Sequence, residues 1–171
     1  MKPTIFFATV LFSLNSLAQT PEENLKSLKI QLPSASAPVA SYVNAVRTGN
    51  LIFLAGKGPR KENGEYITGK LGDSLNIQQG YEAARLTGIN QLAVLKEILG
   101  DLSKIKRIVK VNGYVNSTNN FYNQPQVING YSDLMIQVFG EKGRHARTAI
   151  GVNTLPMNIA VEVEMVVEVG Q

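Results

Sequence analysis

The C-terminal ribbon IAVEVEMVVEV, residues 159–169, constrains the fold more than any other stretch of this chain. Apolar residues recur at every second position and would share one face of a strand: Ile159, Val161, Val163 and Met165. The other face carries Ala160, Glu162 and Glu164. Because successive strand side chains point to opposite faces of a sheet, one face belongs to the core and the other carries charge. A strand at about residues 147–152, joined to the ribbon by NTLPMN, would complete a buried hairpin.

Two amphipathic helices, separated by a strand, are expected before this hairpin. Apolar residues follow helical spacing over residues 77–99, and Gly100 stands where a helix C-terminus favours glycine. The β-branched, partly alternating stretch 105–115 indicates a strand. Helical spacing returns over residues 127–139, between a proline and a glycine.

The first half of the chain adds a further hairpin. Residues 43–47 and 51–55 flank Thr48-Gly49-Asn50, which is typical of a hairpin loop, and Asn63-Gly64 marks a second tight turn. The resulting order, β-β-α-β-α-β-β, predicts an α+β domain with two helices packed on one face of a mixed sheet. The second sheet face would stay open, where a partner subunit could cover it.

The N-terminus has the layout of a cleaved secretory signal. Met1-Lys2 gives a positive start, residues 5–14 give an apolar run, and Ser16-Leu17-Ala18 gives small residues for a cut near Ala18. The alternative is a buried N-terminal helix or strand. We expect an exported protein, periplasmic or secreted, with no membrane attachment after cleavage. Residues 1–18 would be the signal peptide, 19–40 a capped helix and linker, and 41–171 the main domain.

The composition excludes several kinds of catalytic and binding site. Lys and Arg number 17 against 13 Asp and Glu, and they are scattered, so nucleic-acid binding has no support. The chain has no cysteine and one histidine, which excludes disulfides, thiolate catalysis and a His-rich metal centre within one chain. No nucleotide-binding glycine motif occurs. We therefore expect neither metal nor cofactor.

The array Ala146-Arg147, Leu155-Pro156 and Val161-Glu162-Val163-Glu164 resembles the C-terminal signature of the RidA/YjgF family. The arginine precedes Glu162 by 15 residues, with Leu-Pro eight and nine residues after it. SYVNAVRTGNLIFLAG is similar to the family's first hairpin, so the resemblance covers about residues 40–169. It implies a chorismate mutase-like fold, assembled as a homotrimer with sites in the clefts between subunits. The family contains imine deaminases, historically labelled endoribonuclease L-PSP.

The resemblance also implies roles for particular residues. Arg147 matches the family's carboxylate-binding arginine, and a guanidinium suits a planar carboxylate. The alternative for Arg147 is a structural salt bridge with a nearby glutamate. Glu162 matches the glutamate that positions or activates water. Glu164 is expected to be solvated or ion-paired. His145 would share the strand face of Arg147, and the sequence supplies it with no partner, so a structural role is expected.

Four further residues are substrate-binding candidates on the same ground. Tyr42 matches a tyrosine at the cleft mouth, although it could instead pack against the linker, and Asn129 matches an asparagine at the start of the second helix. Ala55 and Gly56 fall in a loop where the family often has serine, and Ala149 stands where it often has cysteine. These departures leave Arg147 and Glu162 in place, and we expect the missing hydroxyl and thiol to affect substrate orientation and rate.

The resemblance implies cofactor-independent hydrolysis of small 2-imino or 2-enamino acids to 2-oxo acids and ammonia. Because fold alone does not fix function, a non-catalytic module that binds a small carboxylate is the alternative. Ribonuclease activity, which an old family label suggests, ranks last, since the sequence has no pair of histidines or basic groove for it.

Overall fold

The computed structural model of the chain describes residues 19–38 and 40–170, so the predicted signal peptide lies outside the described residues. Within these residues, five strands form one sheet: β1 (Ala45–Thr48), β2 (Leu51–Lys57), β3 (Ile105–Asn116), β4 (Ala146–Val152) and β5 (Val161–Val169). Their order across the sheet is β1-β2-β5-β3-β4. The sheet is mixed, because β3 and β4 run parallel whereas the other neighbours run antiparallel.

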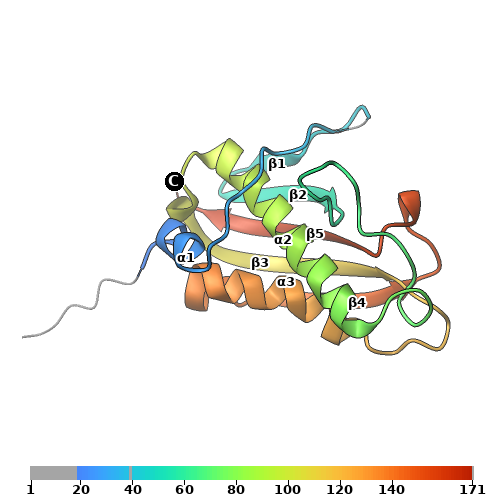
Figure 1. Ribbon diagram of the computed structural model, residues 1–171. Helices are drawn as coiled ribbons and strands as arrows, with labels where there is room; N and C mark the ends of the chain where they lie inside the picture. Colours follow the sequence, from blue (N-terminus) through green and yellow to red (C-terminus); the bar gives the residue numbers. More distant parts are fainter. Residues whose placement is uncertain (1–18, 39, 171) are drawn as a thin grey trace, which may run out of the picture.

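The helices cover one face of this sheet. The α-helices are α1 (Pro21–Ser27), α2 (Ile77–Leu99) and α3 (Gln124–Phe139), and three short 3₁₀ turns span Leu102–Lys104, Gly140–Gly143 and Pro156–Asn158. In Figure 1, α2 and α3 lie side by side on the same side of the strands. The predicted α+β class, with two helices on one face of a mixed sheet, is confirmed.

Local signals set the ends of α2 as expected. Asn76 caps its start: Asn76 Oδ1 accepts a hydrogen bond from Gln79 N, and Gln79 Oε1 accepts one from Asn76 N. Gly100 ends the helix in the left-handed conformation with φ of 72°. The two long helices approach closely at Gly130 of α3, where a Cβ atom would collide with the main chain of Tyr81 on α2. Glycine at this point therefore permits the helix layer to pack tightly.

The N-terminal helix belongs to the folded body. Thr20 and Glu23 form the predicted capping box, with Thr20 N donating to Glu23 Oε2 at 2.8 Å and Glu23 N donating to Thr20 Oγ1 at 3.2 Å. Asn24 Nδ2 donates to the carbonyl of Val138 on α3 at 2.9 Å, and Leu25 is buried. These contacts attach α1 to the end of α3.

One topological prediction was wrong. The strands at 147–152 and 159–169 do not pair with each other as a hairpin, because β3 lies between β4 and β5 and pairs with both. On β3, Val111 has Arg147 on one side and Met165 on the other. The short segment between β4 and β5 does not require these two strands to pair with each other. Because β4 runs parallel to β3, the chain can cross the end of β3 after β4 and enter β5 on the other side of β3.

The second face of the sheet carries no helix in the described part of the chain (Figure 1). The alternation of β5 is as predicted, with Val161, Val163 and Met165 buried against the helices and Glu162 and Glu164 on the open side. Apolar side chains also lie exposed on this open face: Val46 at 57%, Phe53 at 45% and Ile150 at 45%. Among the described helices, none combines the length and apolar character needed to cross a bilayer.

Candidate functional site

Arg147 lies on the edge strand β4 and reaches toward the helix layer. It pairs in register with Val111, whose side chain is fully buried beneath the helices, so both side chains share that face of the sheet. Its Nη1 atom donates to Asn129 Oδ1 at 2.9 Å and to Ser132 Oγ at 3.0 Å, both on α3. The structure thus brings the predicted Asn129 and Arg147 together, with Asn129 holding the guanidinium.

The structural salt bridge considered for Arg147 is not found among residues 19–38 and 40–170. The ion pairs of these residues are Lys61–Glu65, Lys96–Glu22, Arg107–Glu168 and Arg144–Glu141. Arg147 is instead held by two neutral oxygen acceptors, which orient the guanidinium without neutralising its charge. Its other N–H groups suit an incoming carboxylate, which an arginine fork binds bidentately.

His145 has a partner that the sequence did not reveal. Its Nε2 atom lies 3.0 Å from Ser132 Oγ, and its Nδ1 atom lies 2.6 Å from the carbonyl oxygen of Gly143. Burial lowers the pKa of His145, and the charge of Arg147 acts in the same direction, against the opposing effect of the Gly143 hydrogen bond. We call Asn129, Ser132, His145 and Arg147 the arginine cluster.

Ser132 is the member of this cluster that sequence reasoning missed. It lies three residues after Asn129 on α3, and side chains three apart share one face of a helix. Helical spacing from Asn129 is therefore the signal that could have found it. Ala149 follows Arg147 on the same strand face and packs against the core, at the position where a thiol was considered.

Glu162 projects from β5 on the open face, opposite Tyr114 of β3. The carboxylate is about half-buried, and burial raises its pKa, with a further increase from the charge of Glu164. A Cβ atom at Gly56 would collide with the Glu162 carboxylate, so glycine lets this side chain lie against the β2 backbone. Gly56 belongs to the irregular end of β2 and not to a loop, which corrects the prediction for Ala55 and Gly56.

Glu162 opens into a cavity of about 280 Å³, which we call the glutamate cleft. Its lining comes from the linker and the residues before β1, the end of β2 and the loop after it, and the turn before β5 with the start of that strand: Ser36, Ala37, Tyr42, Gly56, Lys57, Gly58, Tyr66, Pro156, Met157, Ile159 and Glu162. Tyr42 is half-exposed and lines this cleft together with Ser36 and Ala37 of the linker. Ala55 lies outside this lining, and its carbonyl accepts a hydrogen bond from Gln91 at 3.0 Å.

Glu164 is partly exposed and forms no ion pair within the described residues, so the ion-paired alternative is not found. Its Oε1 atom accepts hydrogen bonds from Asn112 Nδ2 at 2.9 Å and from Tyr114 OH at 3.2 Å. These neutral donors keep a second negative charge close to Glu162, and that charge helps to raise the pKa of Glu162.

The two groups lie on opposite faces of the sheet. Arg147 shares the face of Val111 and Val163, beneath the helices, whereas Glu162 shares the open face with Tyr114. A single chain therefore does not bring Arg147 and Glu162 to one substrate. Within the described residues, no group of three or more His, Asp or Glu is placed to hold a metal ion.

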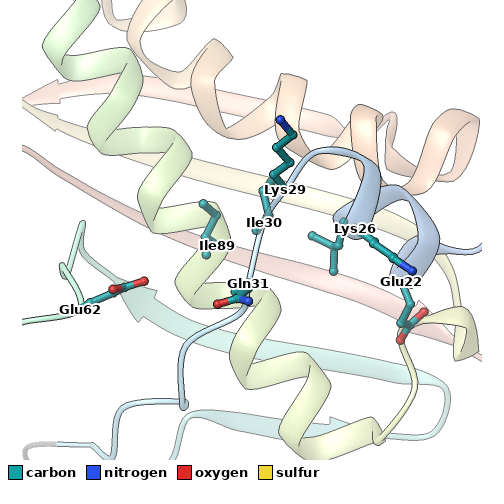
Figure 2. Close-up of a pocket in the computed structure, with 8 residues that line it drawn as sticks. Glu22, Lys26, Lys29, Ile30, Gln31, Glu62 and Ile89 are labelled. Carbon is teal, nitrogen blue, oxygen red and sulfur yellow. The ribbon is translucent and has the colours of Figure 1, made fainter.

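A larger cavity of about 660 Å³ lies between α1 and α2 (Figure 2). Its charged groups do not converge: Glu62 and Glu22 lie toward opposite ends of the view, and Glu22 already accepts hydrogen bonds from Lys96 Nζ and Leu102 N at 2.8 Å each. A binding site needs polar groups directed at one ligand, so this cavity is a weaker candidate despite its volume.

Comparison with known proteins agrees with this architecture. The family model described as "YjgF/chorismate_mutase-like, putative endoribonuclease" matches residues 22–169, and so includes α1. Protein TCP17 of Trypanosoma cruzi is 45% identical over 85% of this chain and 91% of its own length. A 2-iminobutanoate/2-iminopropanoate deaminase of Dermatophagoides farinae is 32% identical over 81% of this chain and 93% of its own.

A solved structure shows the same fold. A protein of unknown function from Agrobacterium tumefaciens superposes with a TM-score of 0.80 and 41% identity, covering 88% of this chain and 92% of the other. The mixed five-stranded sheet and a family match over nearly the whole chain agree. The protein belongs to the YjgF/chorismate mutase-like, or RidA, family.

Proposed function

We propose that this protein hydrolyses small 2-imino and 2-enamino acids to 2-oxo acids and ammonia, without a cofactor, at a site shared by two subunits of a homotrimer. The observation that carries the proposal is the division of the chemistry between two faces of one sheet. Arg147 offers a carboxylate-binding group on one face, and Glu162 offers a proton-transferring group on the other. A neighbouring subunit is the element that can supply the missing half of each site.

The open sheet face supports such an assembly. Val46, Phe53 and Ile150 expose about half of their side chains there, around the strand that carries Glu162. Covering apolar surface gains about 25 cal/mol per Å² removed from water, so a second subunit on this face would be stabilising. Glu162 and its cleft would then lie at the subunit boundary.

In the reaction, the guanidinium of Arg147 would bind the substrate carboxylate and orient the imine carbon. Ionised Glu162 would take a proton from water as the water oxygen bonds to the carbon of the protonated imine, giving a neutral carbinolamine. The protonated carboxyl would then pass this proton to the amino nitrogen. As the C–N bond breaks to release ammonia, the regenerated carboxylate would take the hydroxyl proton, which leaves the 2-oxo acid. A raised pKa suits Glu162 to both steps, because the group must accept and return a proton.

The test is an assay of purified protein with 2-iminobutanoate and 2-iminopropanoate generated in the cuvette. The wild type is expected to accelerate imine loss, and Arg147→Ala to lose about 100-fold or more in kcat/KM because the carboxylate loses its charged partner. Arg144→Ala is the matched control, since Arg144 is exposed and, in the part of the chain that the structure describes, pairs only with Glu141 three residues away. Imine loss equal to the buffer blank would refute the enzymatic proposal.

The non-catalytic module is separated from the enzyme by the same proteins. If the wild type binds 2-oxobutanoate through Arg147 but does not accelerate imine loss, the binding module is the better description. Light scattering tests the assembly: we expect a mass near three times that of one chain. A monomer would contradict the shared site under either function.

Export remains part of the proposal, since a signal-like N-terminus precedes the family domain. We expect N-terminal sequencing of protein from an exporting host to begin near Gln19. Retention of Met1 on exported protein would contradict cleavage.

A further inference from the structure

A continuous chain of hydrogen bonds runs behind Arg147. Its Nη1 atom lies 3.0 Å from Ser132 Oγ, which lies 3.0 Å from His145 Nε2, and His145 Nδ1 lies 2.6 Å from the Gly143 carbonyl. The four residues come from α3, the 3₁₀ turn that follows it, and the entry to β4. Nothing in the expected site chemistry uses Ser132 or His145.

The chemistry of the two ends fixes the direction of every bond in this chain. A carbonyl oxygen can only accept, so His145 carries its hydrogen on Nδ1, and in the neutral ring Nε2 is then an acceptor. A guanidinium can only donate, so Ser132 Oγ accepts from Arg147. The Ser132 hydroxyl hydrogen is left to donate to His145 Nε2, which turns the serine lone pairs toward the guanidinium.

Gly143, whose carbonyl ends this series of hydrogen bonds, is sterically fixed. Gly143 is buried, and a Cβ atom there would collide with the main chain of Met135 on α3. Its carbonyl therefore has little freedom to move away from His145. Burial also lowers the pKa of His145, which agrees with a neutral ring beside the charge of Arg147.

We propose that Ser132 and His145 are positioning residues, which hold Arg147 in the orientation that receives the substrate carboxylate. This inference rests on the proposed function, because it assumes that Arg147 binds that carboxylate. An arginine side chain has many rotamers, and ordering it before the ligand arrives removes an entropic cost from binding. Asn129, one turn earlier on α3, accepts a hydrogen bond from the same Nη1 atom. We call the hydrogen bonds through Ser132 and His145 to the Gly143 carbonyl the relay; the relay and Asn129 together fix the guanidinium.

The experiment uses pairs of variants that either remove or keep each hydrogen-bonding group. Ser132→Ala and His145→Leu remove the relay, whereas Ser132→Thr keeps a hydroxyl and His145→Gln keeps an acceptor. We expect each removing variant to raise both KM for 2-iminobutanoate and Kd for 2-oxobutanoate about tenfold, with kcat within about twofold, which corresponds to one lost hydrogen bond to a charged group. The conserving variants should recover most of this loss. Ser27→Ala is the control: the Ser27 hydroxyl on α1 donates to the backbone carbonyl of Glu23 and has no other hydrogen bond among the described residues.

Wild-type KM and Kd in folded Ser132→Ala protein would overturn the inference, as would a loss that Ser132→Thr does not recover. If the wild type hydrolyses the imine while these variants match it, the inference fails and the proposed function stands. If the wild type neither hydrolyses the imine nor binds 2-oxobutanoate, the proposed function itself has failed.

A spectroscopic measurement needs no variant that might fold poorly. His145 is the only histidine of the chain, so its ring nitrogens can be assigned directly in untagged protein labelled with ¹⁵N-histidine. We expect the neutral ring to carry its hydrogen on Nδ1, and Ser132→Ala to shift the Nε2 resonance. A ring with its hydrogen on Nε2 would overturn the relay.

Discussion

The arginine cluster and the glutamate cleft differ in how the surrounding groups act on the charged side chain. Arg147 is held by the neutral oxygens of Asn129 and Ser132, which orient its charge and leave it unpaired within the described residues. Glu162 is half-buried beside the charge of Glu164, and both effects disfavour its ionised form. One region holds a fixed charge in place, and the other raises the pKa of its carboxyl group. The proposed shared site requires such a difference between its two halves.

The largest expected effect comes from Glu162→Gln. Removing the proton-transferring group should lower kcat about 100-fold or more, while thermal stability at neutral pH should not fall, because a buried charge that lies near Glu164 is removed. Steady-state kinetics and thermal melts measure the two quantities. Glu168→Gln is the matched control, on the same strand and face but paired with Arg107. A variant that keeps wild-type kcat would remove Glu162 from the mechanism.

Mixing the two inactive variants tests whether the halves belong to different subunits. Subunits carrying Arg147→Ala and subunits carrying Glu162→Gln, dissociated and reassembled together, should recover about a quarter of wild-type activity, the fraction of sites that receive both intact residues at random. Each variant reassembled alone is the control. No recovery in verified mixed trimers would contradict a shared site.

Gly56→Ala tests whether the position of the Glu162 carboxylate matters for activity, because it moves this group without replacing it. The added methyl group would displace the Glu162 carboxylate, which is the flexible end of a side chain, so we expect about a tenfold loss of kcat/KM with little change in stability. Gly170→Ala is the control, since a Cβ there meets nothing nearer than 3.9 Å. Unchanged activity in Gly56→Ala would show that this contact does not position the carboxylate.

The smallest effect is expected in the pH profile. Because the pKa of Glu162 is raised above 4.5, activity that needs its ionised form should fall on acidification at a higher pH than an ordinary glutamate would give. Glu164→Gln should shift this acid limb to lower pH, since one like charge is lost. The same raised pKa favours the folded state below the unfolded value, and that contribution is lost as pH rises through the folded pKa. If Glu164→Gln does not shift the acid limb, the fall in activity on acidification comes from a group other than Glu162.

Local patterns predicted the elements well, because each pattern depends on neighbouring residues. Helical spacing placed α2, the capping box at Thr20 started α1, and alternation assigned the two faces of β5. The partners of charged groups were harder to predict. Glu164 meets Asn112 and Tyr114 from β3, about fifty residues earlier in the chain, and no local pattern links them.

His145 shows the same limit at shorter range. The sequence placed it on the strand face of Arg147, but its partner Ser132 comes from the preceding helix across the Gly140–Gly143 turn. Helical spacing from Asn129 fixes only which face of α3 Ser132 occupies. The angle at which α3 crosses β4 brings that face against the strand, and this angle depends on packing throughout the helix layer.

By itself, the sequence determined the strands and helices, the buried and charged faces of β5, and the identity of the residues that match the family signature. The tertiary structure decided that Arg147 and Glu162 face opposite sides of the sheet. The alternation of side chains between the two faces holds only within one strand. Across the turn between β4 and β5 it no longer predicts which face a side chain occupies. The insertion of β3 between those strands is a non-local pairing, so only the folded sheet shows that one chain does not bring Arg147 and Glu162 together.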